Sequence, residues 1–293
     1  MNQTRSIKNP DNIDIAFLIA VIIAWVAAIW LGLVEIAQEA VTNEEASHIL
    51  LVPLIAGYII WQRRDAFVQL SASSRWPGLI MMCGGIALSE YGYTSYYKAV
   101  EEFGYLIIGL GAIIVAVGWR ALLPFWPAIV VMVFVIPVPG RIRAEIAIPL
   151  QAWTAEISES LLKTAGFNIH RAGSILYIND QPVGIAEACN GARMVYAVFL
   201  VCYAYAMTSS MKSWAKVSIL FFSPLVAIAC NVLRVIPTVL MYGFSSKDAA
   251  GIFHDLAGWG VIVIAFGAIH LLVMLGGWLG LPIQLPAKSL TSN

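Results

Sequence analysis

Charged residues are scarce in this chain of 293 residues: Asp, Glu, Lys and Arg make up 12% of it, whereas 60% is hydrophobic. Soluble domains usually carry about a quarter charged residues, so the composition excludes an ordinary soluble domain. Lys and Arg number 17, as do Asp and Glu, and a chain without a basic excess lacks the electrostatic footprint of a nucleic-acid binder. The composition therefore predicts an integral membrane protein with no nucleic-acid partner.

Cysteine is also rare, with four residues in the whole chain and no pair spaced as CxxC. This pattern excludes a secreted disulfide framework and a cysteine-rich zinc site, and we expect no metal and no cofactor. Cys83, Cys202 and Cys230 lie inside apolar runs, where a thiol packs as a small hydrophobic group. Only Cys189 stands at the edge of such a run, among polar neighbours.

Long apolar runs are what the sequence has in abundance. Because a helix needs about 17–25 residues to cross the hydrocarbon core, we predict an all-α polytopic membrane protein with about eight transmembrane helices. We expect one integral membrane domain over 1–293, with its core at about 13–280 and its first run retained as a signal anchor. The predicted spans are 13–34, 49–61, 78–97, 103–119, 121–137, 191–208, 217–240 and 256–279.

The distribution of Lys and Arg predicts the orientation of these spans. Under this count the basic residues of the short loops all fall on one side, which the positive-inside rule makes cytoplasmic. The other side carries Glu35, Glu39, Glu44, Glu45, Glu101 and Glu102. The long connection from about 138 to 190 is therefore expected outside the cytoplasm.

That connection contains two patterns. Apolar residues recur at helical spacing from Ile142 to Leu161, with charged residues between them, which predicts an amphipathic helix on the outer membrane surface. Next, Ile175, Tyr177 and a turn at Asn179-Asp180 predict a short strand or hairpin that leads to Cys189. We expect His48 and His170 at the surface, and a structural role for His270.

Polar residues interrupt the hydrophobic half of the chain at three places. With the predicted orientation, all three lie at the outer ends of spans. Ionisable groups at membrane depth are costly, and they are functional or paired by default. The three places are Cys189 with Arg193, Asn231 with Arg234, and His254 with Asp255.

A thiol, an imidazole and a fixed cation are the parts of a cysteine acyl-transfer site. Cys189 is the candidate nucleophile at a helix N-terminus, His254 the candidate proton carrier, and Arg234 the candidate stabiliser of the oxyanion. Asn231, one turn before Arg234, is placed to orient it. Glu187 would disfavour the thiolate unless a cation such as Arg193 neutralises it, and a simple balance of Glu187 by Arg193 is equally compatible with the sequence.

The motifs ACNGAR at 188–193, NVLR at 231–234 and HDLAGW at 254–259, in this order, resemble the exosortase/archaeosortase family of membrane-embedded cysteine transpeptidases. The resemblance extends from about residue 48 to 279. It implies Cys189 as the nucleophile, Arg234 as the essential arginine and His254 as the histidine, with Arg193 as a further arginine of the cysteine motif. Many members have serine where this chain has Asn190.

The resemblance also implies a function. It predicts cleavage of C-terminal sorting signals of the PEP-CTERM type on exported proteins at the outer face of a bacterial inner membrane, linked to exopolysaccharide and envelope biogenesis. Membrane lipid is an expected partner, and water or an amine of a glycan or lipid would accept the acyl group. A transporter or channel with Arg234 and Glu187 in its pathway, or a non-catalytic envelope scaffold, are the alternatives that the residues leave open.

Overall fold

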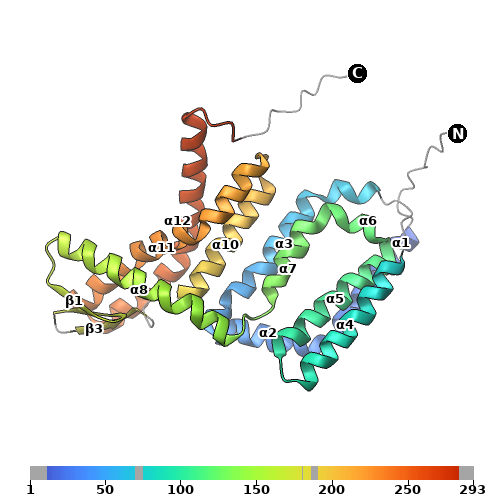
Figure 1. Ribbon diagram of the computed structural model, residues 1–293, viewed down its shortest axis with the longest axis horizontal. Coiled ribbons are helices and arrows are strands. Elements are labelled where there is room, and N and C mark those ends of the chain that lie inside the picture. Colours follow the sequence, from blue (N-terminus) through green and yellow to red (C-terminus); the bar gives the residue numbers. More distant parts are fainter. Residues whose placement is uncertain (1–11, 70–74, 180, 186–190, 284–293) are drawn as a thin grey trace. The chain divides into compact units, whose positions relative to one another are not determined.

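The protein is described here from a computed structural model, which covers residues 12–69, 75–179, 181–185 and 191–283 (Figure 1). Within these ranges, the side chains of 12–17, 44–45, 67–69, 191–193, 247, 254–255, 259 and 262 are not described. The chain forms two compact units, Met1–Pro139 and Gly140–Asn293, and each is considered by itself.

The first unit is helical throughout its described part. Its elements are α1 (Asn12–Ala28), α2 (Trp30–Thr42), η1 (Glu44–Leu50), α3 (Leu51–Gln62), η2 (Arg64–Gln69), α4 (Trp76–Thr94), α5 (Lys98–Val117), α6 (Trp119–Leu122), η3 (Leu123–Phe125), α7 (Trp126–Met132) and η4 (Val133–Val135). α5 is followed by Gly118, whose φ of +86° is a conformation that favours glycine.

Glycines let α4 and α5 lie against each other at short distance. Gly78, Gly85 and Gly92 recur every seven residues on α4, and Gly104 and Gly111 do so on α5. A Cβ added at Gly85 would lie 2.9 Å from the carbonyl oxygen of Gly104, and one at Gly104 would lie 2.8 Å from that of Gly85. Small residues at helix interfaces are the usual means of packing helices closely in membranes. The two helices run side by side in Figure 1.

The second unit combines helices with one small antiparallel sheet. Its helices are α8 (Gly140–Thr164), α10 (Gly191–Thr208), α11 (Ser213–Phe244) and α12 (Lys247–Trp278). The sheet has the order β1 (Ile169–Ala172), β2 (Ile175–Ile178) and β3 (Gln181–Gly184). Ser246 caps α12, because its side-chain oxygen accepts a hydrogen bond from the amide of Ala249 at 3.3 Å.

The structure confirms a helix followed by strands in the long connection. The amphipathic segment is helix α8, and Glu159 in its last two turns bonds Lys163 on α8 and Arg171 on β1, at 2.8 Å and 3.2 Å. The predicted turn begins at Asn179, whose φ is +48°, a conformation that asparagine tolerates well. The sheet has three strands rather than a hairpin, so the fold is not purely α-helical.

Every predicted span coincides with helical structure, but the count of eight is not confirmed. By length and composition, the described residues contain two helices able to cross a membrane, α5 and α11, and up to five spans if each bent helix pair counts as one. The 12 residues of α3 rise only about 18 Å, short of a hydrocarbon core about 30 Å thick. The coarser prediction, a mostly helical membrane protein, stands.

The exposure of the histidines agrees only in part with the prediction from the sequence. His170 is exposed and stacks on Tyr177, with ring centroids 4.8 Å apart. His48 is only 4% exposed on η1, so the prediction of a surface residue was wrong there. His270 Nδ1 lies 3.1 Å from the hydroxyl of Tyr205, which joins α12 to α10.

Candidate active site

Helix α11 carries the candidate arginine and packs against the other helices and the sheet of the second unit. It contacts α8, α10, α12 and strands β2 and β3. Arg234 is 5% exposed and Asn231 4%, so both polar side chains are held inside the protein. Burying a guanidinium costs free energy unless other groups compensate it, which marks this turn of α11 as one whose polar residues have a specific role.

Asn231 ties this turn of α11 to α8. Its Nδ2 donates a hydrogen bond to Oγ1 of Thr154 at 3.0 Å, and Thr154 is fully buried. The observed partner of the Asn231 amide is therefore on α8. Asn231 itself lies one turn before Arg234 on α11. This bond fixes where the Arg234 segment of α11 lies against α8.

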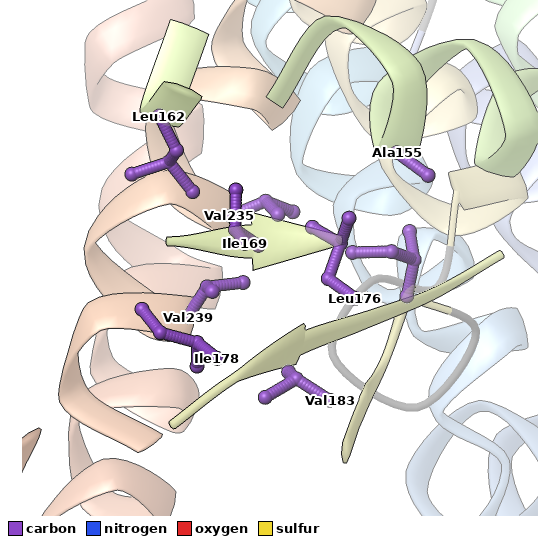
Figure 2. Packing of buried hydrophobic residues seen from close by; sticks show 9 residues of the cluster. Ala155, Leu162, Ile169, Leu176, Ile178, Val183, Val235 and Val239 are labelled. Atoms are coloured by element: carbon purple, nitrogen blue, oxygen red, sulfur yellow. The ribbon is translucent and has the colours of Figure 1, made fainter. Parts of the chain in front are cut away.

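The sheet packs on the same side of α11, immediately after Arg234. Val235 and Val239 belong to one buried cluster with residues of α8 and of all three strands. Figure 2 shows them beside Ile169 and Ile178. Further along, Asn179 Nδ2 donates to the carbonyl of Gly243 at 3.1 Å, so the sheet is attached at two levels to the last third of α11.

The described residues on both sides of the cysteine motif belong to this assembly. Ile185 follows β3, is fully buried in the same cluster, and donates its amide to the carbonyl of Ser174 at 2.8 Å. Helix α10 begins within the motif, at Gly191. Its Met194 packs in a second buried cluster with Cys230 of α11 and Val261 of α12.

Counting along the helix hairpins gives the relative levels of α10, α11 and α12. Gly191 lies 17 residues before the end of α10 and Cys230 lies 17 after the start of α11. Ala257 lies ten residues after the start of α12, and Arg234 lies ten before the end of α11. Helices joined by short connections pack antiparallel, so the start of α10 and the backbone at 254–257 lie within about two turns of the level of Arg234.

Several predicted site residues lie outside the described part of the structure. Glu187, Cys189 and Asn190 fall in the stretch 186–190, and the side chains of Arg193, His254 and Asp255 are not described. Their roles stay predictions. Among the predicted residues, the structure describes the side chains of Asn231 and Arg234.

The sequence analysis missed two buried polar residues of α8. Thr154 and Ser158 are both fully buried, and Ser158 Oγ has no hydrogen-bond partner among the described residues. They lie four residues apart, hence on one face of the helix. The signal was weak, because Thr154 and Ser158 lie beside the predicted apolar stripe rather than in it. Trp153, Ile157 and Leu161 of that stripe are exposed, and the buried face is the adjacent one, which also carries Leu150 and Leu162.

The fold and the buried polar turn of α11 define a multi-pass helical membrane protein with an interior polar site. A profile of the transmembrane exosortases matches residues 40–271, which is most of the chain. The chain therefore belongs to the transmembrane exosortase family. Comparison with curated proteins and with solved structures gave no match.

Proposed function

We propose that this exosortase family member is a cysteine endopeptidase or transpeptidase of the inner membrane. Its substrates are exported proteins with a C-terminal sorting signal of the PEP-CTERM type, in which a short recognition motif precedes a transmembrane helix. The observation that carries the proposal is the buried Arg234 beside the Asn231–Thr154 hydrogen bond, in a chain whose exosortase match includes residues 189, 234 and 254.

In the proposed first step, the thiolate of Cys189 attacks the scissile carbonyl carbon, and His254 holds the proton that the thiol has lost. Negative charge develops on the carbonyl oxygen, and Arg234 donates hydrogen bonds to that oxyanion. The C–N bond then breaks, His254 gives its proton to the leaving amine, and the C-terminal segment departs. The N-terminal part of the substrate remains as a thioester on Cys189.

In the second step, water or a primary amine attacks the thioester while His254 takes the proton of the nucleophile. The C–S bond breaks and Cys189 leaves as the thiolate, so the enzyme returns to its starting state. Water gives a shortened protein with a free carboxylate, and an amine of a glycan or lipid gives an amide. Glu187, Arg193 and Asp255 are proposed to set the charge around these three groups, with Asn190 as a neutral polar neighbour.

Burial explains why an arginine would suit the oxyanion position. A guanidinium stays charged at all physiological pH values and donates in a fixed planar geometry, and in a site shielded from water each donor is worth a few kcal/mol at the transition state. The Asn231–Thr154 bond holds the backbone of that turn, so the donor is positioned before the reaction starts.

The test is co-expression with an exported reporter that ends in a PEP-CTERM signal. Wild type should shorten the reporter, and Cys189→Ala, Arg234→Ala and His254→Ala should leave it intact. Cys202→Ala and Arg141→Ala are controls, because Cys202 is buried among apolar residues of α10, α11 and α12 and the side chain of Arg141 is 92% exposed. Both controls should cleave.

Trapping the acyl-enzyme tests the covalent step. Hydroxylamine added to a reacting membrane preparation should release the N-terminal product as a hydroxamate, because it attacks thioesters rapidly. Cleavage by Cys189→Ala would refute the nucleophile. If wild type leaves every reporter uncut although the protein is folded in the membrane, the peptidase proposal fails and a transport function becomes the better account of Arg234.

A further inference from the structure

The first unit contains an apolar cavity with a buried carboxylate in its wall. The cavity measures about 330 Å³ and is lined by residues of α1, α2, η1, α3, α5, α7 and η4. Among the described residues that line it, Glu102 alone carries a charge. Ligand pockets in proteins start at about 300 Å³ and are mostly apolar, with a few placed polar groups, so this cavity has the size and composition of a binding site.

Glu102 has nothing in the described structure to bond with. The residue is 5% exposed, and neither carboxylate oxygen has a hydrogen-bond partner among the described residues. An ionised carboxylate has about four acceptor positions, and leaving them unused inside a protein costs several kcal/mol. A donor from outside the chain would remove this cost.

The polar groups nearest to the cavity are already engaged. Trp25 Nε1 donates to the carbonyl of Tyr105 at 3.0 Å, and the hydroxyl of Tyr105 donates to Oε1 of Glu101 at 2.6 Å. Lys98 lies one turn before Glu102, but its Nζ lies 3.2 Å from a carboxylate oxygen of Glu35. Trp25 and Tyr105 of the wall, and Lys98 one turn away from Glu102, thus have acceptors other than Glu102.

The surrounding charge favours a cation. Glu35, Glu39 and Glu101 lie close enough to Glu102 to act on it electrostatically, and Lys98 is the basic residue that does so. Four carboxylates against one ammonium leave an excess of negative charge. A ligand that places an ammonium against Glu102 fills the empty acceptors, and the surrounding negative potential favours that placement.

The wall of the cavity selects the rest of the ligand. Apart from Glu102 the wall is mostly apolar, so the part of the ligand that enters the cavity is expected to be a hydrocarbon. A flexible hydrocarbon chain can follow an irregular apolar space. Glu102 is the fifth residue of α5, about 6 Å from the helix start along its axis. This depth matches a polar head near the membrane surface with a chain extending inward.

We propose that this cavity binds a phospholipid whose head carries a primary ammonium, with the ammonium bonded to Glu102 and one acyl chain among Trp25, Ile36, Leu106 and Val135. The site lies within the first unit and is independent of the peptidase chemistry proposed for the second. A charge-assisted hydrogen bond made away from water gives roughly a tenfold preference or more over a lipid that cannot donate.

The test measures lipid binding directly. Delipidated protein in detergent is mixed with equal amounts of dioleoyl phosphatidylethanolamine, phosphatidylcholine and phosphatidylglycerol, and native mass spectrometry counts the adducts of each. Wild type should hold one phosphatidylethanolamine about ten times more often than either other lipid. Glu102→Gln should lose this preference, whereas Glu90→Gln, at an exposed glutamate of α4 outside the lining, should keep it.

A second pair of variants tests the cavity itself. Ala37→Trp fills the lined space and should abolish the specific adduct, whereas Val41→Trp, one turn further on α2, 74% exposed and outside the lining, should not. Unchanged selectivity in Glu102→Gln, equal binding of phosphatidylcholine, or unchanged binding in Ala37→Trp would each overturn the proposal. Cys189→Ala should bind lipid as wild type does, so failure of the peptidase proposal would be seen separately.

Discussion

Asn231 of α11 donates a hydrogen bond to the hydroxyl of Thr154 on α8, at 3.0 Å and with both side chains buried. The two residues are 77 positions apart in the chain. This bond fixes the lateral position of the α11 turn that carries Arg234, since the α8 side of it is anchored in the same cluster as the sheet through Ala155 and Leu162.

Thr154→Val should therefore destabilise the protein and reduce cleavage together. The substitution keeps the shape of the side chain but removes the acceptor of the Asn231 amide, at a cost of about 1–3 kcal/mol. Thermal unfolding in detergent should show a lower Tm, and Thr154→Ser, which keeps the hydroxyl, should restore it. Thr164→Val is the matched control on the same helix, because the Thr164 hydroxyl is exposed and bonds only the Ser160 carbonyl among the described residues. An equal loss in Thr164→Val would contradict the assignment.

Arg234→Lys should lower kcat while leaving KM nearly unchanged. Lysine keeps the charge but not the planar fork of donors, and loss of an oxyanion donor costs about 10²–10³ in kcat. The oxyanion exists only at the transition state, so substrate binding is spared. Arg141→Lys, at a side chain 92% exposed, should retain the wild-type rate. A raised KM with unchanged kcat would show that Arg234 binds the substrate rather than stabilising the oxyanion.

Gly85→Ala should weaken the packing of α4 on α5. The added Cβ would meet the Gly104 carbonyl at 2.9 Å and Ile108 at 2.8 Å, and such overpacking costs about 1–3 kcal/mol. Gly84→Ala is the neighbouring control, because a Cβ there has nothing within 4 Å, and alanine favours a helix by up to about 1 kcal/mol over glycine. Thermal unfolding should show a lower Tm for Gly85→Ala than for Gly84→Ala, and equal Tm values would refute close packing at Gly85.

Ser223→Ala should loosen α11 around Pro224. Proline has no amide hydrogen for the carbonyl of Leu220, and the hydroxyl of Ser223, which is 1% exposed, donates to that carbonyl at 2.8 Å. Its loss should cost about 1 kcal/mol and speed hydrogen exchange of the helix around Leu220. Ser218→Ala is the control. The Ser218 hydroxyl also donates to a carbonyl one turn back, that of Trp214, but this carbonyl faces a residue with a backbone amide hydrogen, Ser218, rather than a proline. Equal exchange rates in both variants would contradict this role.

Acid should release the contact between α8 and β1. Hydrogen bonds from Lys163 and then Arg171 hold the pKa of Glu159 below its usual value of 4.5. Because this pKa is lowered on folding, the stabilisation is present above pH 4.5 and is lost as the pH falls through the folded pKa. In wild type the Tm should therefore drop below pH 4.5 more than in Glu159→Gln, which has no carboxylate to protonate. Parallel acid profiles of the two proteins would show that the contact contributes nothing.

Local patterns were enough to place the secondary structure of this chain. The apolar runs coincide with helices, and the amphipathic segment before the sheet is a helix, because both patterns depend on neighbours three or four residues away. The strands were harder, since Ile169–Ala172 pairs with Ile175–Ile178 only across a tight turn at Gly173. The count of spans could not be read in the same way, because apolar runs do not reveal bends such as the 69° one between the first two helices.

Burial of polar residues followed from tertiary packing. Nothing in the sequence around His48 or Glu102 separates them from exposed neighbours such as Tyr97 or Lys98, yet both are buried. Thr154 was overlooked for the same reason, since its partner is supplied by a distant helix. Glu102 and Thr154 are residues that the two proposals now use, together with Arg234, which was singled out because a charge within an apolar run is costly wherever it packs.

The sequence by itself determined that the chain is a helical membrane protein, and its motifs pointed to the exosortases, because hydrophobicity and motif spacing are properties of contiguous residues. Only the tertiary structure decided that Asn231 bonds Thr154, that the sheet packs on α11 beside Arg234, and that Glu102 faces an apolar cavity. The physical reason is that each of these contacts joins segments far apart in the chain, and their energy depends on close packing and excluded water, which no local pattern encodes.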